Sequence, residues 1–242
     1  MPFRKIGLAR RSRLICRADV LNLALSDLTD HGGLFLKGAA LTLALTAFAI
    51  LAGMLLGILG AAGRRSRLAP VRWLSGAYVE LIRNTPFIVQ LFFIFFGLPK
   101  LGVKMSSVEA AFLALSINLG GYATEIIRAG LDAIGKGSWE AGFSLGLTRW
   151  QTFRLVILVP ALQKVWPALT SQFIIILLGS SVVSQIAVED LTYVGSFIQS
   201  RNFRAFETTL VVAGIYLCLA IGAQLLFKRI GRRLFAYAEM AR

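Results

Sequence analysis

The chain has 242 residues, of which 57% are hydrophobic and 16% are charged, and its mean hydropathy is +0.72; these values exclude an ordinary soluble domain and predict an integral membrane protein. The formal net charge is +14, but the Lys and Arg residues cluster between and beside apolar segments instead of forming one basic face, so no nucleic-acid partner is expected. Two cysteines, Cys16 and Cys218, and one histidine, His31, lack the spacing of metal ligands, so no metal, no other cofactor and no disulfide framework is expected.

Residues 1–37 are predicted to form a basic amino-terminal tail. Six basic residues come first and three acidic residues follow, before Lys37 at its end: Arg4, Lys5, Arg10, Arg11, Arg13, Arg17, Asp19, Asp27 and Asp30. The tail has no clean apolar run followed by a small-residue cleavage site, so we do not predict a secretory signal peptide. Its alternating Leu, Ile and Arg residues suit a position along a membrane surface.

Residues 38–242 are predicted to form an all-α domain with five transmembrane helices. A helix needs about 20 mainly apolar residues to cross the hydrocarbon core. Five segments fit: 38–62, 73–98, 108–127, 167–188 and 208–227. In the first of them, Gly53 and Gly57 have the small-xxx-small spacing that allows close packing of helices.

The second span is the least regular of the five. Its purely apolar part, 86–98, is too short to cross a membrane unless the more polar residues 73–85 belong to it. Pro86 then predicts a kink inside the helix, because it removes an internal hydrogen bond. Glu80 and Arg83 are three residues apart and are predicted to pair on one face.

The third span carries the first candidate residues of a substrate path. Ser106 and Glu109 have capping-box spacing and predict where its helix begins. Asn118, Tyr122 and Glu125 follow at i, i+4 and i+7, so they share one helical face. Glu125 could meet the ammonium or a cationic side chain of an amino acid; the alternative is that it pairs with Arg128 or lies at the cytoplasmic boundary.

Ser180 and Ser181 lie where the fourth span becomes polar. Their hydroxyls could contribute to the same path, but serines in membranes also simply form hydrogen bonds between helices. Both interpretations are open from the sequence.

The distribution of basic residues predicts the orientation, because Lys and Arg are retained in cytoplasmic loops. Basic residues concentrate after spans one, three and five: Arg64, Arg65, Arg67, Arg72, Arg128, Lys136, Arg149, Arg154, Lys228, Arg229, Arg232 and Arg233. This places the amino terminus outside, the carboxyl terminus in the cytoplasm and the loop 128–155 in the cytoplasm. The basic tail runs against this bias.

The loop 128–155 is predicted to contain a short helix followed by the start of another. Gly137 or Ser138 can cap the first helix, Glu140 then falls in its first turn, and Gly146 can end it in the left-handed conformation. Thr148 and Gln151 have capping-box spacing and predict where the second helix starts, which leads into span four. A helix of about two turns is marginal in water, so it is expected to gain stability from a partner.

Phe143 and Leu145 offer the apolar anchors that such a partner would bind in a groove. The alternative is an ordinary connecting loop.

The segment from Glu140 to Gly146 resembles the EAA loop of permease subunits in ATP-binding-cassette (ABC) importers. The family pattern is Glu-Ala-Ala, three residues and Gly; this chain has Glu140, Ala141, Gly142 and Gly146. Three further segments look like those of the polar amino-acid uptake branch, in the same order: "YVELIRNTPFIVQLFFIFFGLP" (78–99), "NLGGYATEIIRAG" (118–130) and "SSVVSQIAVEDL" (180–191). The resemblance extends from residue 38 to the carboxyl end.

This resemblance implies a type I ABC importer permease fold in a bacterial inner membrane. It implies three partners: a homodimer of ATPase subunits, a second permease subunit that is identical or paralogous, and an extracytoplasmic solute-binding protein. The substrate would be a polar or charged L-amino acid. The coupling loop would contact the ATPase through Glu140, Ala141, Gly142, Leu145 and Gly146.

Two features refine this interpretation. The chain has no GxxxxGK[ST] phosphate loop, so it is not expected to power transport alone. The resemblance implies a transport subunit that is not an enzyme, with ATP hydrolysis in a partner subunit. Gly142 stands where the family usually has Ala, which lowers the helix propensity of the coupling helix by about 1 kcal/mol, unless the partner needs the closer approach that a glycine allows. The alternative function is an ion-coupled secondary amino-acid transporter, against which the lack of an evident inverted repeat argues.

Overall fold

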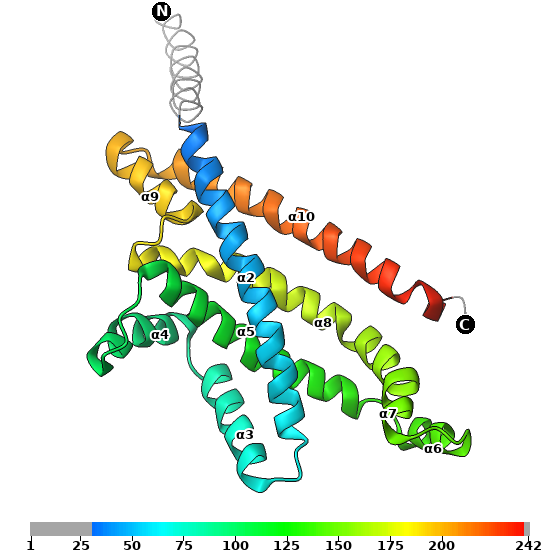
Figure 1. The fold of residues 1–242 in the computed structure, drawn as a ribbon. Helices are drawn as coiled ribbons and strands as arrows, with labels where there is room; N and C mark the ends of the chain where they lie inside the picture. The colour runs from blue at the N-terminus through cyan, green and yellow to red at the C-terminus, as the bar shows by residue number, and fades with distance from the viewer. Residues whose placement is uncertain (1–30, 240–242) are drawn as a thin grey trace, which may run out of the picture.

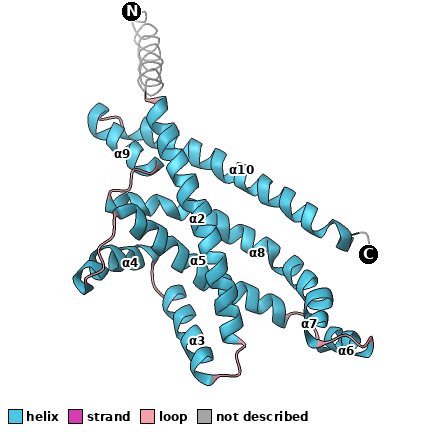
Figure 2. Cartoon of the chain, viewed as in Figure 1, coloured by secondary structure: helices cyan, strands magenta, loops and turns pink. Residues whose placement is uncertain are grey.

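The structure, a computed structural model, describes residues 31–239, with side chains to position 235. Over this range the chain is helical and contains no strand (Figure 2). The elements are α2 (Gly32–Arg64), α3 (Ala69–Arg83), α4 (Phe87–Phe92), η1 (Phe93–Gly97), η2 (Leu98–Leu101), α5 (Ser107–Asp132), α6 (Lys136–Ser144), α7 (Arg149–Thr152), η3 (Phe153–Ile157), α8 (Leu158–Gly179), η4 (Ser180–Ile186), α9 (Leu191–Asn202) and α10 (Ala205–Glu239). Residues 1–30 of the predicted tail lie outside the described range, and 32–37 belong to α2.

The described residues contain a helical segment for each of the five predicted spans. Four segments are long and apolar enough to cross a membrane: Gly32–Arg64, Ser107–Asp132, Arg149–Ile186 and Ala205–Phe235. The fifth consists of two helices, Ala69–Arg83 and Phe87–Leu101, which meet at an angle of 111°. The helices extend beyond the predicted spans, because their polar ends continue the hydrogen bonding of the apolar parts.

The helix α2 packs along α5 at the centre of the fold (Figure 1). Gly53 and Gly57 make this close approach possible, as their spacing predicted. A Cβ atom on Gly53 would lie 2.8 Å from the Cβ of Leu119, and one on Gly57 would lie 2.5 Å from the Cβ of Ala123. The helix α8 also packs on α5, and α10 packs on α8.

The predicted kink at Pro86 is wrong, because the chain breaks there completely. Helix α3 ends at Arg83, and Pro86 is the extended residue that precedes α4. The residue before a proline avoids the helical conformation, which favours an end of the helix at this point. A break exposes carbonyl groups, and these are satisfied by the side chain of Gln90, described below.

A buried polar cluster around Asp190 joins α2, α9 and α10 at the end of the molecule near residue 31. Asp190 caps α9 by accepting a hydrogen bond from the amide of Tyr193, 2.9 Å away, and it also accepts one from the hydroxyl of Tyr216 at 3.1 Å. The amide of Leu191 donates to the hydroxyl of Thr42 in α2. Burial raises the pKa of the Asp190 carboxyl.

Candidate functional site: a coupling unit and a polar hollow

Helix α6 begins earlier than the sequence predicted. Gly135 has extended backbone angles and precedes the helix, and the amide of Ser138 already donates to the carbonyl of Gly135. The prediction that Gly137 or Ser138 caps the helix is therefore wrong. Glu140 consequently lies in the second turn and not in the first, so it is too far from the helix start for the helix dipole to favour it strongly.

The end of α6 and the start of α7 follow the prediction. Gly146 has a φ of 75°, the left-handed conformation that glycine adopts without strain. Its amide donates to the carbonyl of Phe143 at 2.9 Å. Thr148 and Gln151 form a complete capping box, with reciprocal bonds of 2.9 and 3.4 Å. A sharp turn thus sends the chain from α6 back into the helix of span four.

Aromatic rings and one close backbone contact hold α6 against the segment that follows. The rings of Trp139 and Phe153 stack with centroids 6.5 Å apart, and Trp150 stacks on the same Phe153 ring at 5.9 Å. Gly142 is the one buried residue of α6, and it faces Thr152, whose side chain is fully buried. We call α6, α7 and η3 together the coupling unit.

The other side of α6 is exposed. Glu140 and Ala141 are exposed, and the apolar side chains of Phe143 and Leu145 have exposed fractions of 45% and 77%. The unit lies at one end of the molecule, beyond the packed spans (Figure 1). It presents an acidic and an apolar group together, which is the chemistry of a helix that binds in a groove.

A hollow of about 490 Å³ lies at the break between α3 and α4. It is lined by Arg83, Asn84, Thr85, Pro86, Phe87, Asn118, Tyr122, Gln172 and Ile175. Two of the predicted path residues, Asn118 and Tyr122, therefore lie together here. Gln172 of α8 is only 7% exposed, and within the described part of the chain its carboxamide has no hydrogen-bond partner.

The side chain of Gln90 bridges the break between α3 and α4 with hydrogen bonds. Its Nε2 donates to the carbonyl of Ile82 at 2.8 Å and to the carbonyl of Thr85 at 3.0 Å, so it satisfies groups that the end of α3 leaves free. Its Oε1 accepts a hydrogen bond from Asn118 at 2.9 Å. Sequence reasoning placed Gln90 in the span without a role; the signal was a Gln four residues after a proline in an apolar run.

Arg83 lies over the ring of Tyr122, with its guanidinium carbon 5.9 Å from the ring centroid. The predicted pairing of Glu80 with Arg83 is wrong. Glu80 instead accepts a hydrogen bond from the side chain of Asn84 at 3.0 Å, because residues four apart share one helical face and the Asn84 amide still donates to the carbonyl of Glu80. The Arg83 side chain is thereby left at the rim of the hollow.

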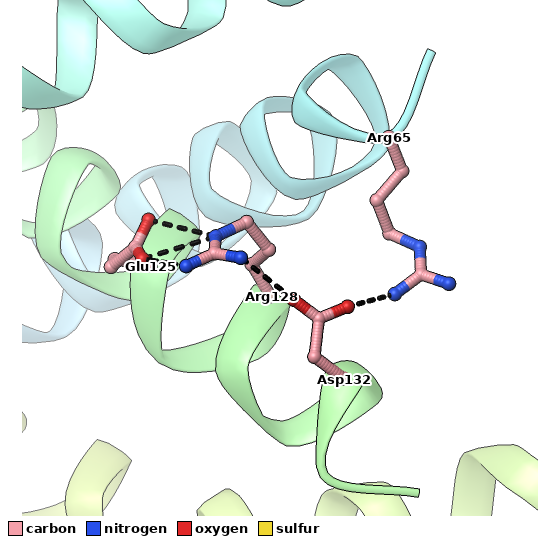
Figure 3. A network of polar contacts seen from close by, with 4 residues as sticks. All are labelled: Arg65, Glu125, Arg128 and Asp132. Atoms are coloured by element: carbon pink, nitrogen blue, oxygen red, sulfur yellow. Dashed lines mark hydrogen bonds and ion pairs between the residues drawn. The ribbon is translucent and has the colours of Figure 1, made fainter. Parts of the chain in front are cut away.

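Glu125 lies apart from the hollow, in a chain of ion pairs at the end of α5 (Figure 3). The Arg128 Nε atom lies 3.0 and 3.1 Å from the two Glu125 carboxylate oxygens. Arg128 also pairs with Asp132 at 2.7 Å, and Asp132 pairs with Arg65 at the end of α2. The sequence left open whether Glu125 meets a substrate or pairs with Arg128. In the structure Glu125 pairs with Arg128.

Ser180 and Ser181 form local hydrogen bonds. The hydroxyl of Ser180 donates to the carbonyl of Leu177 at 2.7 Å, and that of Ser181 donates to the carbonyl of Leu178 at 2.8 Å. They lie where α8 tightens into the 3₁₀ segment η4. No group of three or more His, Cys, Asp or Glu residues that could hold a metal ion occurs in the range 31–239.

Comparison with known proteins shows to which family this helical chain belongs. The family described as "Binding-protein-dependent transport system inner membrane component" matches residues 33–236. The chain belongs to this family. The permease is therefore a multi-pass inner-membrane transport component and not an enzyme, and it works with an ATPase and a binding protein.

Two similar proteins carry names of amino-acid systems. The permease is 37% identical over 201 residues to the L-cystine transport system permease protein TcyB of Bacillus subtilis, covering 83% of this chain and 86% of that one. It is 36% identical over 203 residues to the glutamine transport system permease protein GlnP of Escherichia coli strain K12, covering 83% of this chain and 93% of that one.

Solved structures agree with the predicted fold. The permease superposes on a crystal structure of an amino acid ABC transporter with histidines with a TM-score of 0.79 and 37% identity, covering 85% of this chain and 96% of that one. An inward-facing structure of the MetNI methionine ABC transporter gives a TM-score of 0.70 at 22% identity, which concerns the fold alone. The type I ABC importer permease fold is thus confirmed.

Proposed function

We propose that this permease is the transmembrane subunit of an ATP-driven importer of polar or charged L-amino acids. The observation that carries the proposal is the coupling unit: a short helix packed on the start of span four, with Glu140, Phe143 and Leu145 exposed on its other side. The cystine and glutamine systems named for similar permeases support the substrate class. An ion-coupled secondary transporter has no need for such a unit.

The orientation follows from the basic loops, with the amino terminus outside and the coupling unit in the cytoplasm. In this orientation the helix α6 sits in a groove of an ATPase subunit, and the coupling residues are Glu140, Ala141, Gly142, Leu145 and Gly146. Two ATPase subunits require two coupling helices, so a second permease, identical or paralogous, completes the path. The solute-binding protein docks on the outer side.

The substrate path passes the hollow at the break of span two. Arg83 at its rim can bind the carboxylate of an amino acid with two parallel hydrogen bonds. Asn118, Tyr122 and the carboxamide of Gln172 line the same space and can bind the remaining polar groups. Glu125 belongs to the cytoplasmic end of the path, where it holds Arg128. Ser180 and Ser181 lie at the other end of α8, where their hydroxyls shape the backbone of η4.

Replacing Glu140 by Ala tests the proposed coupling role. The variant is expected to insert normally but to bind the ATPase less tightly or to hydrolyse ATP without import, because it changes only the exposed side of α6. The measurement is uptake of amino acid and ATP hydrolysis by the complete transporter in proteoliposomes. The control Glu207→Ala removes an acidic residue at the start of α10, on the predicted outer side. Unchanged coupling in Glu140→Ala would refute the role.

A further inference from the structure

The contact between Gly142 and Thr152 leaves no room for a larger residue at position 142. A Cβ atom built on Gly142 would lie 2.9 Å from the Oγ1 and 3.1 Å from the Cβ of Thr152, and closer still to its Cγ2. Threonine branches at Cβ and is stiff about χ1, so rotation cannot move all three atoms away. The Thr152 side chain is also fully buried, which leaves it nowhere to go.

This contact and the stacking of Trp139 on Phe153 act together. Trp139 and Gly142 are three residues apart and share one face of α6, while Thr152 and Phe153 are neighbours at the start of the helical run Arg149–Ile186. Two points of contact fix both the distance and the direction of a helix. The exposed side of α6, with Glu140 and Phe143, is thereby set relative to span four.

We propose that Thr152 is a positioning residue for coupling: packed on Gly142, it fixes how closely α6 lies against the start of span four, and so where the coupling residues meet the ATPase. The inference rests on the proposed function of α6. This positioning role explains why the chain has Gly142 where the EAA loop of the family usually has Ala. The loss of helix propensity at a glycine is offset by an approach that a methyl group would prevent.

The test introduces the family residue and then removes its obstacle. The complete transporter, meaning this chain purified with its ATPase and binding protein, is reconstituted as wild type, Gly142→Ala, Thr152→Ala and Gly142→Ala/Thr152→Ala. The measurement is the coupling ratio, the amino acid imported per ATP hydrolysed, with radiolabelled L-glutamine, L-cystine and L-arginine as probes. The melting temperature and the co-purified ATPase are recorded alongside, since a purely structural role would lower the melting temperature and leave the ratio unchanged.

Gly137→Ala is the matched control. It makes the same chemical change in the same helix, at a position where an added Cβ meets nothing within 4 Å. We expect Gly142→Ala to lower the coupling ratio by about fivefold or more, Thr152→Ala by about twofold, and the double variant to return to within about twofold of wild type, since the two residues share one contact. Gly137→Ala is expected to match wild type.

The inference is overturned if the coupling ratio of Gly142→Ala equals that of Gly137→Ala. It is also overturned if the coupling ratio of the double variant is no higher than that of Gly142→Ala. If Gly142→Ala is degraded, the double variant must restore both the amount of chain and the ratio, and failure to do so also overturns it. Glu140→Ala separates this inference from the proposed function. If both the ratio and the co-purified ATPase are unchanged in Glu140→Ala, the coupling role itself is refuted, whereas a decrease in either one there with a normal Gly142→Ala refutes only the role of Thr152.

Discussion

Two of the places where the helices of this permease are interrupted, the break between α3 and α4 and the coupling unit, are held by different forces. At the break between α3 and α4, hydrogen bonds from Gln90 satisfy the free carbonyl groups of Ile82 and Thr85. In the coupling unit, stacked aromatic rings and the contact of Gly142 with Thr152 hold α6 in place.

The difference follows from what surrounds each interruption. A break in a membrane span leaves backbone carbonyl groups without their helical partners, so a side chain must satisfy those that are buried. The coupling unit closes its own turns with Gly146 and the Thr148–Gln151 capping box, so its side chains are free to pack on one side and to bind a partner on the other. The stability of the break is therefore expected to depend on hydrogen bonds, and the position of α6 in the coupling unit on side-chain packing.

The largest effect is expected at the break. Replacing Gln90 by Leu keeps a similar volume but removes the hydrogen bonds to the carbonyls of Ile82 and Thr85. The Ile82 carbonyl is buried, so leaving it without this partner costs about 1–3 kcal/mol. Thermal unfolding of the detergent-solubilised chain should show a clear loss of stability, and uptake should fall. A Val89→Leu variant, at the exposed neighbouring position, is the control. A Gln90→Leu variant as stable as this control would contradict the role of Gln90.

A smaller and different effect is expected in the coupling unit. Replacing Leu145, whose side chain is 77% exposed, by Ser should leave the melting temperature unchanged, because the residue packs on little in the chain itself. Co-purification of the ATPase should nevertheless fall, since an apolar anchor is lost. Loss of stability together with unchanged ATPase binding would reverse the comparison between the two regions.

The smallest effect is expected for the ion pairs of Figure 3. Arg65 and Asp132 are 43% and 46% exposed, and exposed pairs contribute about 0–1 kcal/mol. Replacing Arg65 by Ala should therefore lower stability by less than about 1 kcal/mol, and high salt should reduce the difference further. A loss as large as that of Gln90→Leu would show that hydrogen-bonded charge, and not only the amide of Gln90, holds the spans.

The fold and the coupling loop were largely predictable from local signals. Hydrophobic length indicated five spans, and the spacing of Gly53 with Gly57 and of Thr148 with Gln151 predicted contacts that the structure contains. These signals are local because helix caps and helix faces depend on residues a few positions apart.

The remaining features depend on contacts between distant residues. The break at Pro86 looked like a kink because the bonds that stabilise it come from Gln90, and nothing in the spacing predicts that Asn118 of another span orients the same amide. The close fit of Gly142 on Thr152 likewise exists only after the turn at Gly146 has brought the two together. Such pairings follow from the tertiary structure and not from sequence periodicity.

The central claim is that this permease imports amino acid only with ATP hydrolysed by a separate subunit. The direct test is uptake of radiolabelled L-glutamine, L-cystine and L-arginine into proteoliposomes that contain the permease with its ATPase and binding protein, or the permease alone. We expect uptake that requires ATP and the ATPase and is not driven by an ion gradient. Uptake by the permease alone on an ion gradient would contradict the claim.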